Sequence, residues 1–260
     1  MTDQVGNLFV HRSAARRYAD ARPFFHPLVV DRIVRATGLQ RVNRALDVGC
    51  GTGQSARALL AIAERVEAID VSPEMIAEAE PHPRIHYRVA RAEELPFDSA
   101  SLDLATVGLA FHWFDQAAFL REARRVLVPA GWLVIYNSGF TGEMSEAPAL
   151  RTWITEVYAR RFPAPARRSS GVTAELVTAH GFALAGTETF EHRERMTADQ
   201  LTAYLLTQTN VIAAVENGAT PLPAAEAWIR EGVTPFFSGG TGTLRFAAAQ
   251  WTLQATTAAA

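Results

Sequence analysis

Lysine is absent from this sequence, and cysteine occurs only once, at Cys50. Without lysine the chain has no phosphate-binding P-loop lysine, no Schiff-base lysine and no serine–lysine dyad. A single cysteine excludes an intramolecular disulfide and any metal or cluster site built from several cysteines. All 25 cationic residues are arginine, which together with the many alanines is typical of a GC-rich genome.

Positive and negative charges are close to balanced, which limits the kinds of partner. The chain has 260 residues, of which 48% are hydrophobic, and its formal net charge is −2. This charge gives no strong positive field to favour nucleic acid or an anionic membrane surface. No apolar run reaches the roughly 18 residues that span a bilayer, and the N-terminus lacks the pattern of a secretory signal. We therefore expect a cytoplasmic protein with neither a nucleic acid nor a membrane as partner.

Hydrophobic periodicity predicts an α/β fold for the first half of the chain. The first 40 residues read as helical, and strands then alternate with helices as far as residue 137. This alternation predicts a doubly wound, mostly parallel sheet with helices on both faces. The expected strands are 45–48, 66–69, 85–89, 102–107 and 132–136, with helices at 54–64 and 115–127 among them.

The second half of the chain carries the remaining strands and a helical insertion. Helices are expected at 149–161, 173–180, 197–216 and 223–231, and extended segments at 184–193 and 243–253. An insertion at about 197–237 would form a lid over the ends of the strands, and the alternative is an additional structural layer. The expected divisions are a helical cap at 1–40, a core at 41–140, and the last core strands with the lid at 141–260.

A glycine-rich turn, Gly49-Cys50-Gly51-Thr52-Gly53, lies between the first expected strand and the helix after it. We call residues 49–53 the glycine loop. Glycine permits a positive φ and a close approach of ligand to backbone, and the following helix presents unpaired N–H groups. Such a turn holds a charged, extended cofactor at the carboxyl ends of parallel strands. Its spacing is not the G-x-G-x-x-G of dinucleotide sites, because Gln54 occupies the sixth place.

Asp70 ends the second expected strand, about 20 positions after Gly49, which is the offset at which an acidic side chain binds ribose hydroxyls. A carboxylate can accept both hydrogen bonds of a diol. The sequence therefore predicts a ribose-binding role for Asp70. The alternative is a helix-capping or solvated loop acid.

Four segments in order resemble the class I S-adenosylmethionine (SAM)-dependent methyltransferases. Residues 46–53 are similar to motif I of that class, and the resemblance continues through the segments 69–75, 92–97 and 125–131. Residues 110–115, with Tyr18 and Arg22, resemble the small-molecule subgroup that includes trans-aconitate-type and ubiquinone/menaquinone C-methyltransferases. The resemblance implies a Rossmann-like fold with SAM as cofactor and S-adenosylhomocysteine (SAH) as product.

The resemblance also implies roles for individual residues toward SAM. Asp47 and the glycine loop would hold the methionine end, Asp70 the ribose, Val71 and Met75 the adenine faces, and Ala92 and Glu93 the adenine edge. Relatives often have Gly-Asp where this chain has Ala90-Arg91, which shifts the edge contact to Glu93 or to backbone atoms. The full predicted cofactor set is Tyr18, Arg22, Asp47, Gly49, Gly51, Thr52, Gly53, Gln54, Asp70, Val71, Met75, Ala92, Glu93 and Val107.

The segment 108–114 is expected to face the transferring methyl group, and we call it the transfer wall. Phe111, His112 and Trp113 are the predicted substrate contacts, because aromatic rings supply an apolar floor and stabilise a sulfonium. His112 is the candidate general base, since histidine titrates near neutral pH. The alternatives are a structural histidine and, for Trp113 and Phe114, an ordinary core. Transfer from a good leaving group by in-line positioning alone would need no base.

The insertion contributes the other predicted substrate contacts, Tyr204 and Gln208. Its aromatic residues suit an apolar or aromatic substrate, although a helical layer would bury the same residues. For Arg22 the choice is between binding a carboxylate and forming a surface ion pair. The histidines show no ligand spacing, so no metal is predicted.

These features together predict a SAM-dependent methyltransferase that acts on an O, C or N atom of a small organic molecule. One alternative is an NAD(P)-dependent oxidoreductase, which should carry G-x-G-x-x-G and a catalytic Tyr-Lys or similar pair. The other is a non-catalytic SAM-binding module, which would lack the transfer wall. No feature of the sequence sets the oligomeric state.

Overall fold

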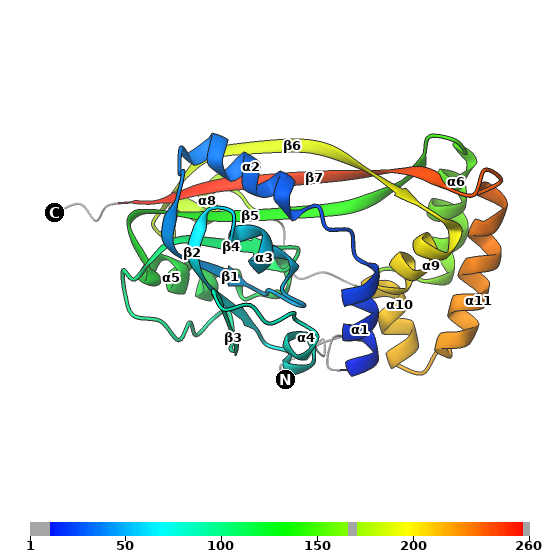
Figure 1. Cartoon of the computed structure of the whole chain (residues 1–260), viewed down its shortest axis with the longest axis horizontal. Helices are drawn as coiled ribbons and strands as arrows, with labels where there is room; N and C mark the ends of the chain where they lie inside the picture. Colours follow the sequence, from blue (N-terminus) through cyan, green and yellow to red (C-terminus); the bar gives the residue numbers. More distant parts are fainter. Residues whose placement is uncertain (1–10, 166–170, 257–260) are drawn as a thin grey trace. The chain divides into compact units, whose positions relative to one another are not determined.

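The computed structural model describes residues 11–165 and 171–256. One seven-stranded sheet has the order β3-β2-β1-β4-β5-β7-β6 (Figure 1). The first five strands pair in parallel, which confirms the predicted doubly wound α/β fold. The strands are β1 (Val42–Val48), β2 (Ala63–Asp70), β3 (Ile85–Val89), β4 (Leu102–Gly108), β5 (Leu127–Met144), β6 (Phe182–Met196) and β7 (Gly242–Ala255).

The last strand reverses direction in the sheet. Thr141 on β5 bonds to Arg245 on β7, whereas Ala130, near the start of β5, accepts from Gln254, near the end of β7. Residue numbers therefore rise along β5 as they fall along β7, so the two strands are antiparallel. The helical insertion lies between these two strands: β6 ends at Met196, and the chain enters the sheet again at Gly242, where β7 begins.

Helices precede and separate the strands in the described part of the chain. They are α1 (Arg12–Ala21), α2 (His26–Thr37), α3 (Gln54–Leu59), α4 (Pro73–Ala77), α5 (Gln116–Val126), α6 (Ala149–Thr152), α7 (Ala159–Arg161), α8 (Ala174–Thr178), α9 (Ala198–Leu206), α10 (Thr209–Glu216) and α11 (Leu222–Val233). A π-helical turn (Trp153–Tyr158) joins α6 to α7, and 3₁₀ turns lie at Phe111–Trp113 and Thr234–Phe236. None of the helices in the described ranges has the length and apolar character that a bilayer crossing requires.

Two helix predictions need correction. The helix expected at 54–64 ends at Leu59, because a turn leads directly into β2 at Ala63. The single helix expected at 197–216 is broken into α9 and α10 between Leu206 and Thr209. The Thr207 hydroxyl donates to the carbonyl of Tyr204, and Gln208 has extended backbone angles. Local side-chain bonding of this kind competes with the helical pattern.

The chain forms two compact units, and their boundary falls inside β5, β6 and β7. The helical unit comprises, among described residues, 11–23, 139–165 and 191–247; the sheet unit comprises 24–138, 171–190 and 248–256. The helices expected at 197–237 all belong to the helical unit. The expected cap at 1–40 is divided between the units, since α1 lies in the helical unit and α2 in the sheet unit.

The sheet unit has an apolar cluster on each face of the sheet. One contains Ala45 of β1 with residues of α2 and α3, and the other contains Leu46 and Val48 with residues of α5 and α8. A strand covered on both faces is apolar at successive positions rather than at alternating ones. This explains the continuous Ala-Leu-Asp-Val run before the glycine loop, in which only the aspartate breaks the apolar pattern.

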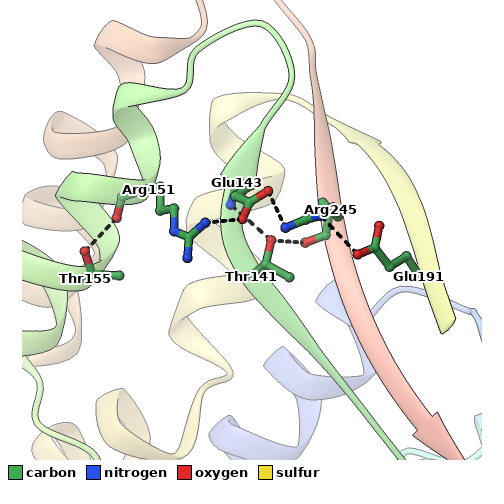
Figure 2. A network of polar contacts seen from close by, with 6 residues as sticks. All are labelled: Thr141, Glu143, Arg151, Thr155, Glu191 and Arg245. Carbon is green, nitrogen blue, oxygen red and sulfur yellow. Dashed lines mark hydrogen bonds and ion pairs between the residues drawn. The ribbon is translucent and has the colours of Figure 1, made fainter. Parts of the chain in front are cut away.

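The helical unit has its own apolar cluster and a polar network. Figure 2 shows Glu143 of β5 between Arg151 and Arg245, with Arg245 also paired to Glu191. The Thr141 hydroxyl donates to the Arg245 carbonyl at 3.0 Å. The network joins β5, β6, β7 and α6 within this unit. Because most of its side chains are partly exposed, its contribution to stability is modest, about 1 kcal/mol per pair at most.

Candidate functional site

The glycine loop turns the chain from β1 into α3. Gly49, Gly51 and Gly53 have φ values of +69°, +53° and +80°, a region that other residues adopt only with strain. The space around them is also filled: a Cβ at Gly49 would lie 2.6 Å from Ala110 Cβ, and one at Gly53 would lie 2.3 Å from Tyr87 Oη. Backbone conformation and packing together therefore require glycine here.

Asp47 lies under the glycine loop and is fully buried. Its carboxylate accepts a hydrogen bond from the Thr106 hydroxyl of β4 at 3.0 Å and another from the Ser55 hydroxyl of α3. Burial raises the pKa of Asp47 to about 6, and the two hydroxyl donors oppose that rise. Asp47 thus joins β1, β4 and the first turn of α3, which is the loop-ordering role that the resemblance implies.

Asp70 connects the end of β2 to the glycine loop. Its carboxylate accepts hydrogen bonds from the backbone amides of Gly51, at 2.8 Å, and Ser72, at 2.9 Å. Burial raises the pKa of Asp70, while these amides and that of Val71 lower it. The N-cap of α4 is the Ser72 hydroxyl, which accepts from the Met75 amide. Asp70 is therefore neither the capping acid nor a freely solvated one.

Apolar surface lies beside Asp70 at the carboxyl ends of β2 and β3. Val71 is 50% exposed and Val89 is 56% exposed, and Val89 is the register partner of Asp70. Met75 is buried, with its methyl carbon 3.0 Å from the place of a Cβ on Gly51. An apolar edge next to a carboxylate is chemically suited to a nucleoside, whose base is flat and whose ribose is polar.

The predicted adenine-edge residues are held by contacts with the start of α5. Ala92 is buried. Glu93 accepts a hydrogen bond from the Asp115 amide at 3.0 Å and pairs with Arg91 at 3.3 Å. The arginine that replaces the acid of relatives is thus the ion-pair partner of Glu93. The Glu93 carboxylate is therefore already engaged by the Asp115 amide and by Arg91, and a contact with a base would add to these two.

The transfer wall begins where β4 ends. Phe111 is 3% exposed and packs on Phe119, with ring centroids 6.0 Å apart. Its side chain therefore belongs to the core. The core alternative was for Trp113 and Phe114, and of these only Phe114 packs against the core, with its ring 5.2 Å from that of Phe119. Trp113 is 37% exposed and lies beside the His112 ring at 4.8 Å. Val107 is also fully buried, so its side chain is closed to a cofactor.

Four predicted contacts lie together in the helical unit. The Arg22 guanidinium lies 4.6 Å from the ring centre of Tyr18 and 5.1 Å from that of Tyr204. It also donates to the Thr207 carbonyl at 2.9 Å. Gln208 follows at the N-cap of α10. Arg22, at the C-cap of α1, therefore joins this helix to the break between α9 and α10. This contact is not the surface ion pair that was the alternative for Arg22.

The remaining loop positions and the cysteine complete the site. Thr52 is buried and Gln54 begins α3. Burial raises the pKa of the Cys50 thiol well above its ordinary value, so it is protonated and unsuited to nucleophilic attack near neutral pH. No group of three potential metal ligands occurs within residues 11–165 and 171–256.

One polar pair beside the wall was missed by sequence reasoning. His26 of α2 and Tyr136 of β5 are both buried and share a hydrogen bond of 2.9 Å between Nδ1 and Oη, across 110 positions of sequence. Neither residue belongs to a motif, and no local spacing links them. Only the packing of α2 on the sheet brings them together.

The comparisons with known proteins agree with this geometry. Residues 46–135 match the family model described as a methyltransferase domain. An uncharacterized methyltransferase of Mycobacterium tuberculosis is 33% identical over 141 residues, which are 52% of this chain and 56% of that protein. An uncharacterized 37.1 kDa transposon protein of Streptomyces fradiae is 31% identical over 85% of this chain and 66% of its own length. The first curated relatives thus match over about half of their own length.

Solved structures extend the likeness of fold to nearly the whole chain. A candidate type II methyltransferase from Anaeromyxobacter dehalogenans is similar over 97% of this chain and 98% of its own, with a TM-score of 0.62 and 24% identity. A geranyl diphosphate methyltransferase in complex with SAM is similar over 98% of this chain and 93% of its own, with a TM-score of 0.51 and 14% identity. Together these matches support a class I SAM-dependent methyltransferase, with residues 46–135 as the methyltransferase domain and SAM as the cofactor.

Proposed function

We propose that this protein transfers the methyl group of SAM to an O, C or N atom of a small apolar or aromatic organic molecule, with release of SAH. The observation that carries the proposal is the hydrogen bond from Gly51 to Asp70. It joins the glycine loop to the carboxylate proposed to bind ribose, beside the exposed Val71 and Val89. This combination fits the charge, diol and base of SAM.

Individual residues have distinct tasks toward the cofactor in this proposal. The glycine loop, ordered by Asp47, lets the methionine end approach the backbone closely. The amides of Gly49, Cys50, Gly51 and Gly53 already donate within the protein. Asp70 orients the ribose, Val71 and Met75 contact the adenine, and Ala92 with Glu93 meets its edge. Tyr18 and Arg22 are the contacts proposed from α1. When bound, SAM supplies an electrophilic methyl group on a sulfonium whose departure leaves a neutral thioether.

The transfer wall would then act on the acceptor. Trp113 is the exposed aromatic group of this segment, and its ring can stabilise a nearby cation. His112, 4.8 Å away between ring centres, would take the acceptor's proton where the acceptor carries one. Alignment of the acceptor with the methyl–sulfur bond supplies much of the rate, because reacting groups held in place avoid the entropy of encounter.

The helical unit supports a small apolar or aromatic acceptor. The Tyr204 ring packs against Phe140 and Phe246, at 6.3 and 5.4 Å between ring centres. Tyr204 is itself 2% exposed, so in this proposal its ring forms the apolar backing of the acceptor site, and Gln208 beside it supplies hydrogen-bonding capacity. The balanced charge of the chain adds no basic stripe of the kind that favours a nucleic acid.

Calorimetric titration with SAH tests the cofactor assignment, with NADH as the comparison ligand. We expect SAH to bind and to stabilise the protein by about 2.7 kcal/mol at a hundred times its dissociation constant, and NADH to have no effect. Binding of NADH in place of SAH would overturn the proposal. A screen of apolar carboxylic acids, phenols and indoles with methyl-labelled SAM then tests transfer. SAH binding without any labelled product would instead favour a non-catalytic SAM-binding module.

A further inference from the structure

The Tyr136 side chain crosses from β5 to the end of β4. Its register partner there is Gly108, and a Cβ on Gly108 would lie 2.5 Å from Tyr136 Oη. Gly108 has an ordinary φ, so its backbone conformation does not call for glycine. The Tyr136 phenol occupies the space that a side chain larger than glycine would need at position 108. The first residue of the transfer wall is therefore in direct contact with Tyr136.

The backbone of Tyr136 holds the next residue of the wall. Its carbonyl accepts a hydrogen bond from the Leu109 amide at 2.9 Å. Leu109 has a φ of +59°, a left-handed conformation that is unfavourable for a non-glycine residue and persists only where its surroundings hold it. Tyr136 thus contacts the wall twice, with its ring over Gly108 and its carbonyl on Leu109.

His26 sets the position of the phenol. Its Nδ1 shares the 2.9 Å hydrogen bond with Tyr136 Oη. The Phe25 ring stacks on the imidazole at 4.5 Å and meets the Tyr136 ring edge-on at 6.1 Å. Phe25, Tyr136 and Cys50 of the glycine loop share one buried cluster, against which Leu109 packs. The hydrogen-bonded pair therefore packs in the same cluster as Cys50 of the glycine loop and Leu109 of the transfer wall, the two segments that the proposed function assigns to the cofactor and to the methyl acceptor.

We propose that His26 and Tyr136 are positioning residues for methyl transfer, which set the height of the transfer wall above the cofactor's methyl group. This inference rests on the proposed function. Both side chains are buried, with His26 7% and Tyr136 3% exposed, so they act through Gly108 and Leu109 rather than by touching the acceptor. Because the wall leaves β4 in a strained turn, a small movement of Tyr136 shifts the whole segment.

A comparison of SAM and SAH binding tests this role without knowledge of the acceptor. The two ligands differ only in the transferable methyl group and its positive charge, so their affinity ratio reports on the surroundings of that methyl. Tyr136→Phe removes the hydroxyl and keeps the ring, and His26→Leu removes its partner. We expect each to change the ratio by about threefold or more with a smaller effect on SAH, because small misplacements at a reacting centre have large effects. His26→Gln, which can still hydrogen-bond to the phenol, should restore most of the wild-type ratio.

Tyr158→Phe is the matched control, because it removes a buried phenol hydroxyl that donates to the Leu205 carbonyl at 3.3 Å in the helical unit. It should cost comparable stability in urea unfolding and leave the ratio unchanged. An unchanged ratio in the His26 and Tyr136 variants, with SAH still bound, would overturn the positioning role and leave the proposed function standing. If Tyr136→Phe does not fold, the affinity ratios of His26→Leu and His26→Gln decide whether the positioning role stands. A wild-type protein that binds neither ligand would overturn the proposed function, and this inference with it.

Discussion

The Asp70 carboxylate accepts a hydrogen bond from the Gly51 amide, and this 2.8 Å contact joins the end of β2 to the glycine loop of β1. A second amide, that of Ser72, holds the other carboxylate oxygen. The orientation of the carboxylate is therefore set before any ligand hydroxyl arrives. Such preorganisation lowers the entropic cost of binding, and under the proposed function the same side chain both shapes the loop and binds the ribose diol.

Replacement of Asp70 by asparagine should weaken SAH binding about tenfold, or about 1.4 kcal/mol. The neutral amide accepts less strongly than a carboxylate, and its NH₂ group cannot accept from the Gly51 amide. Calorimetric titration measures the change. Glu64→Gln is the control, because Glu64 lies on the same strand, is more than half exposed and pairs with the exposed Arg41. Equal affinities for Asp70→Asn and wild type would contradict the ribose role.

Gly53→Ala should destabilise the protein more than Gly38→Ala. Both glycines have positive φ values, +80° and +73°, so the backbone strain is similar. A Cβ at Gly53 would lie 2.3 Å from Tyr87 Oη, whereas nothing lies within 4 Å of one at Gly38. We expect about 1 kcal/mol for Gly38→Ala and a further 1 to 3 kcal/mol for Gly53→Ala. Urea unfolding gives both free energies of unfolding. Equal losses of stability would show that the clash with Tyr87 does not destabilise the variant.

The stability difference between wild type and Asp47→Asn should fall as the pH rises from 4 to 7. Burial raises the pKa of Asp47 from 3.8 to about 6, so between these values the folded state binds more protons than the unfolded state. Stability then decreases with rising pH, by on the order of 2 to 3 kcal/mol for a shift of this size. The asparagine variant cannot lose this proton, and the raised pKa of Asp70 is common to both proteins.

Urea unfolding of both proteins at pH 4, 5, 6 and 7 measures this difference. Glu64→Gln, treated in the same way, should show a small and nearly constant difference from wild type, because its carboxylate is exposed. Parallel stability curves for wild type and Asp47→Asn would mean that Asp47 ionises in the folded protein as it does in the unfolded chain.

Arg22→Lys should destabilise the protein by about 1 to 2 kcal/mol. Lysine keeps the charge but loses the planar group that stacks on Tyr18 and Tyr204 while donating to the Thr207 carbonyl. Arg16→Lys is the control on the same helix, since Arg16 is exposed; it should change stability by less than about 0.5 kcal/mol. Thermal unfolding measures the stability of both variants. Equal losses of stability would contradict a stabilising role for the Arg22 contacts. SAH titration of the same variants tests the proposed cofactor contact of Arg22 separately.

The sheet and the glycine loop could be predicted from sequence because their causes are local. Apolar runs, glycines at fixed offsets and the Ser72-Pro73 helix start act within a few residues. The broken helix at Thr207 could not be predicted in this way. Thr207 bonds locally to the Tyr204 carbonyl, but its own carbonyl accepts from Arg22, a side chain 185 positions away, just after α1.

By itself, the sequence determined the order of strands and helices, the place of the cofactor loop and the acid that follows it. Tertiary structure decided which side chains meet. It placed Phe111 in the core and left Trp113 exposed, and it brought His26 to Tyr136 across 110 positions. The physical reason is that backbone propensity and periodicity act over one or two turns, whereas burial and hydrogen bonding depend on packing between elements far apart in the chain.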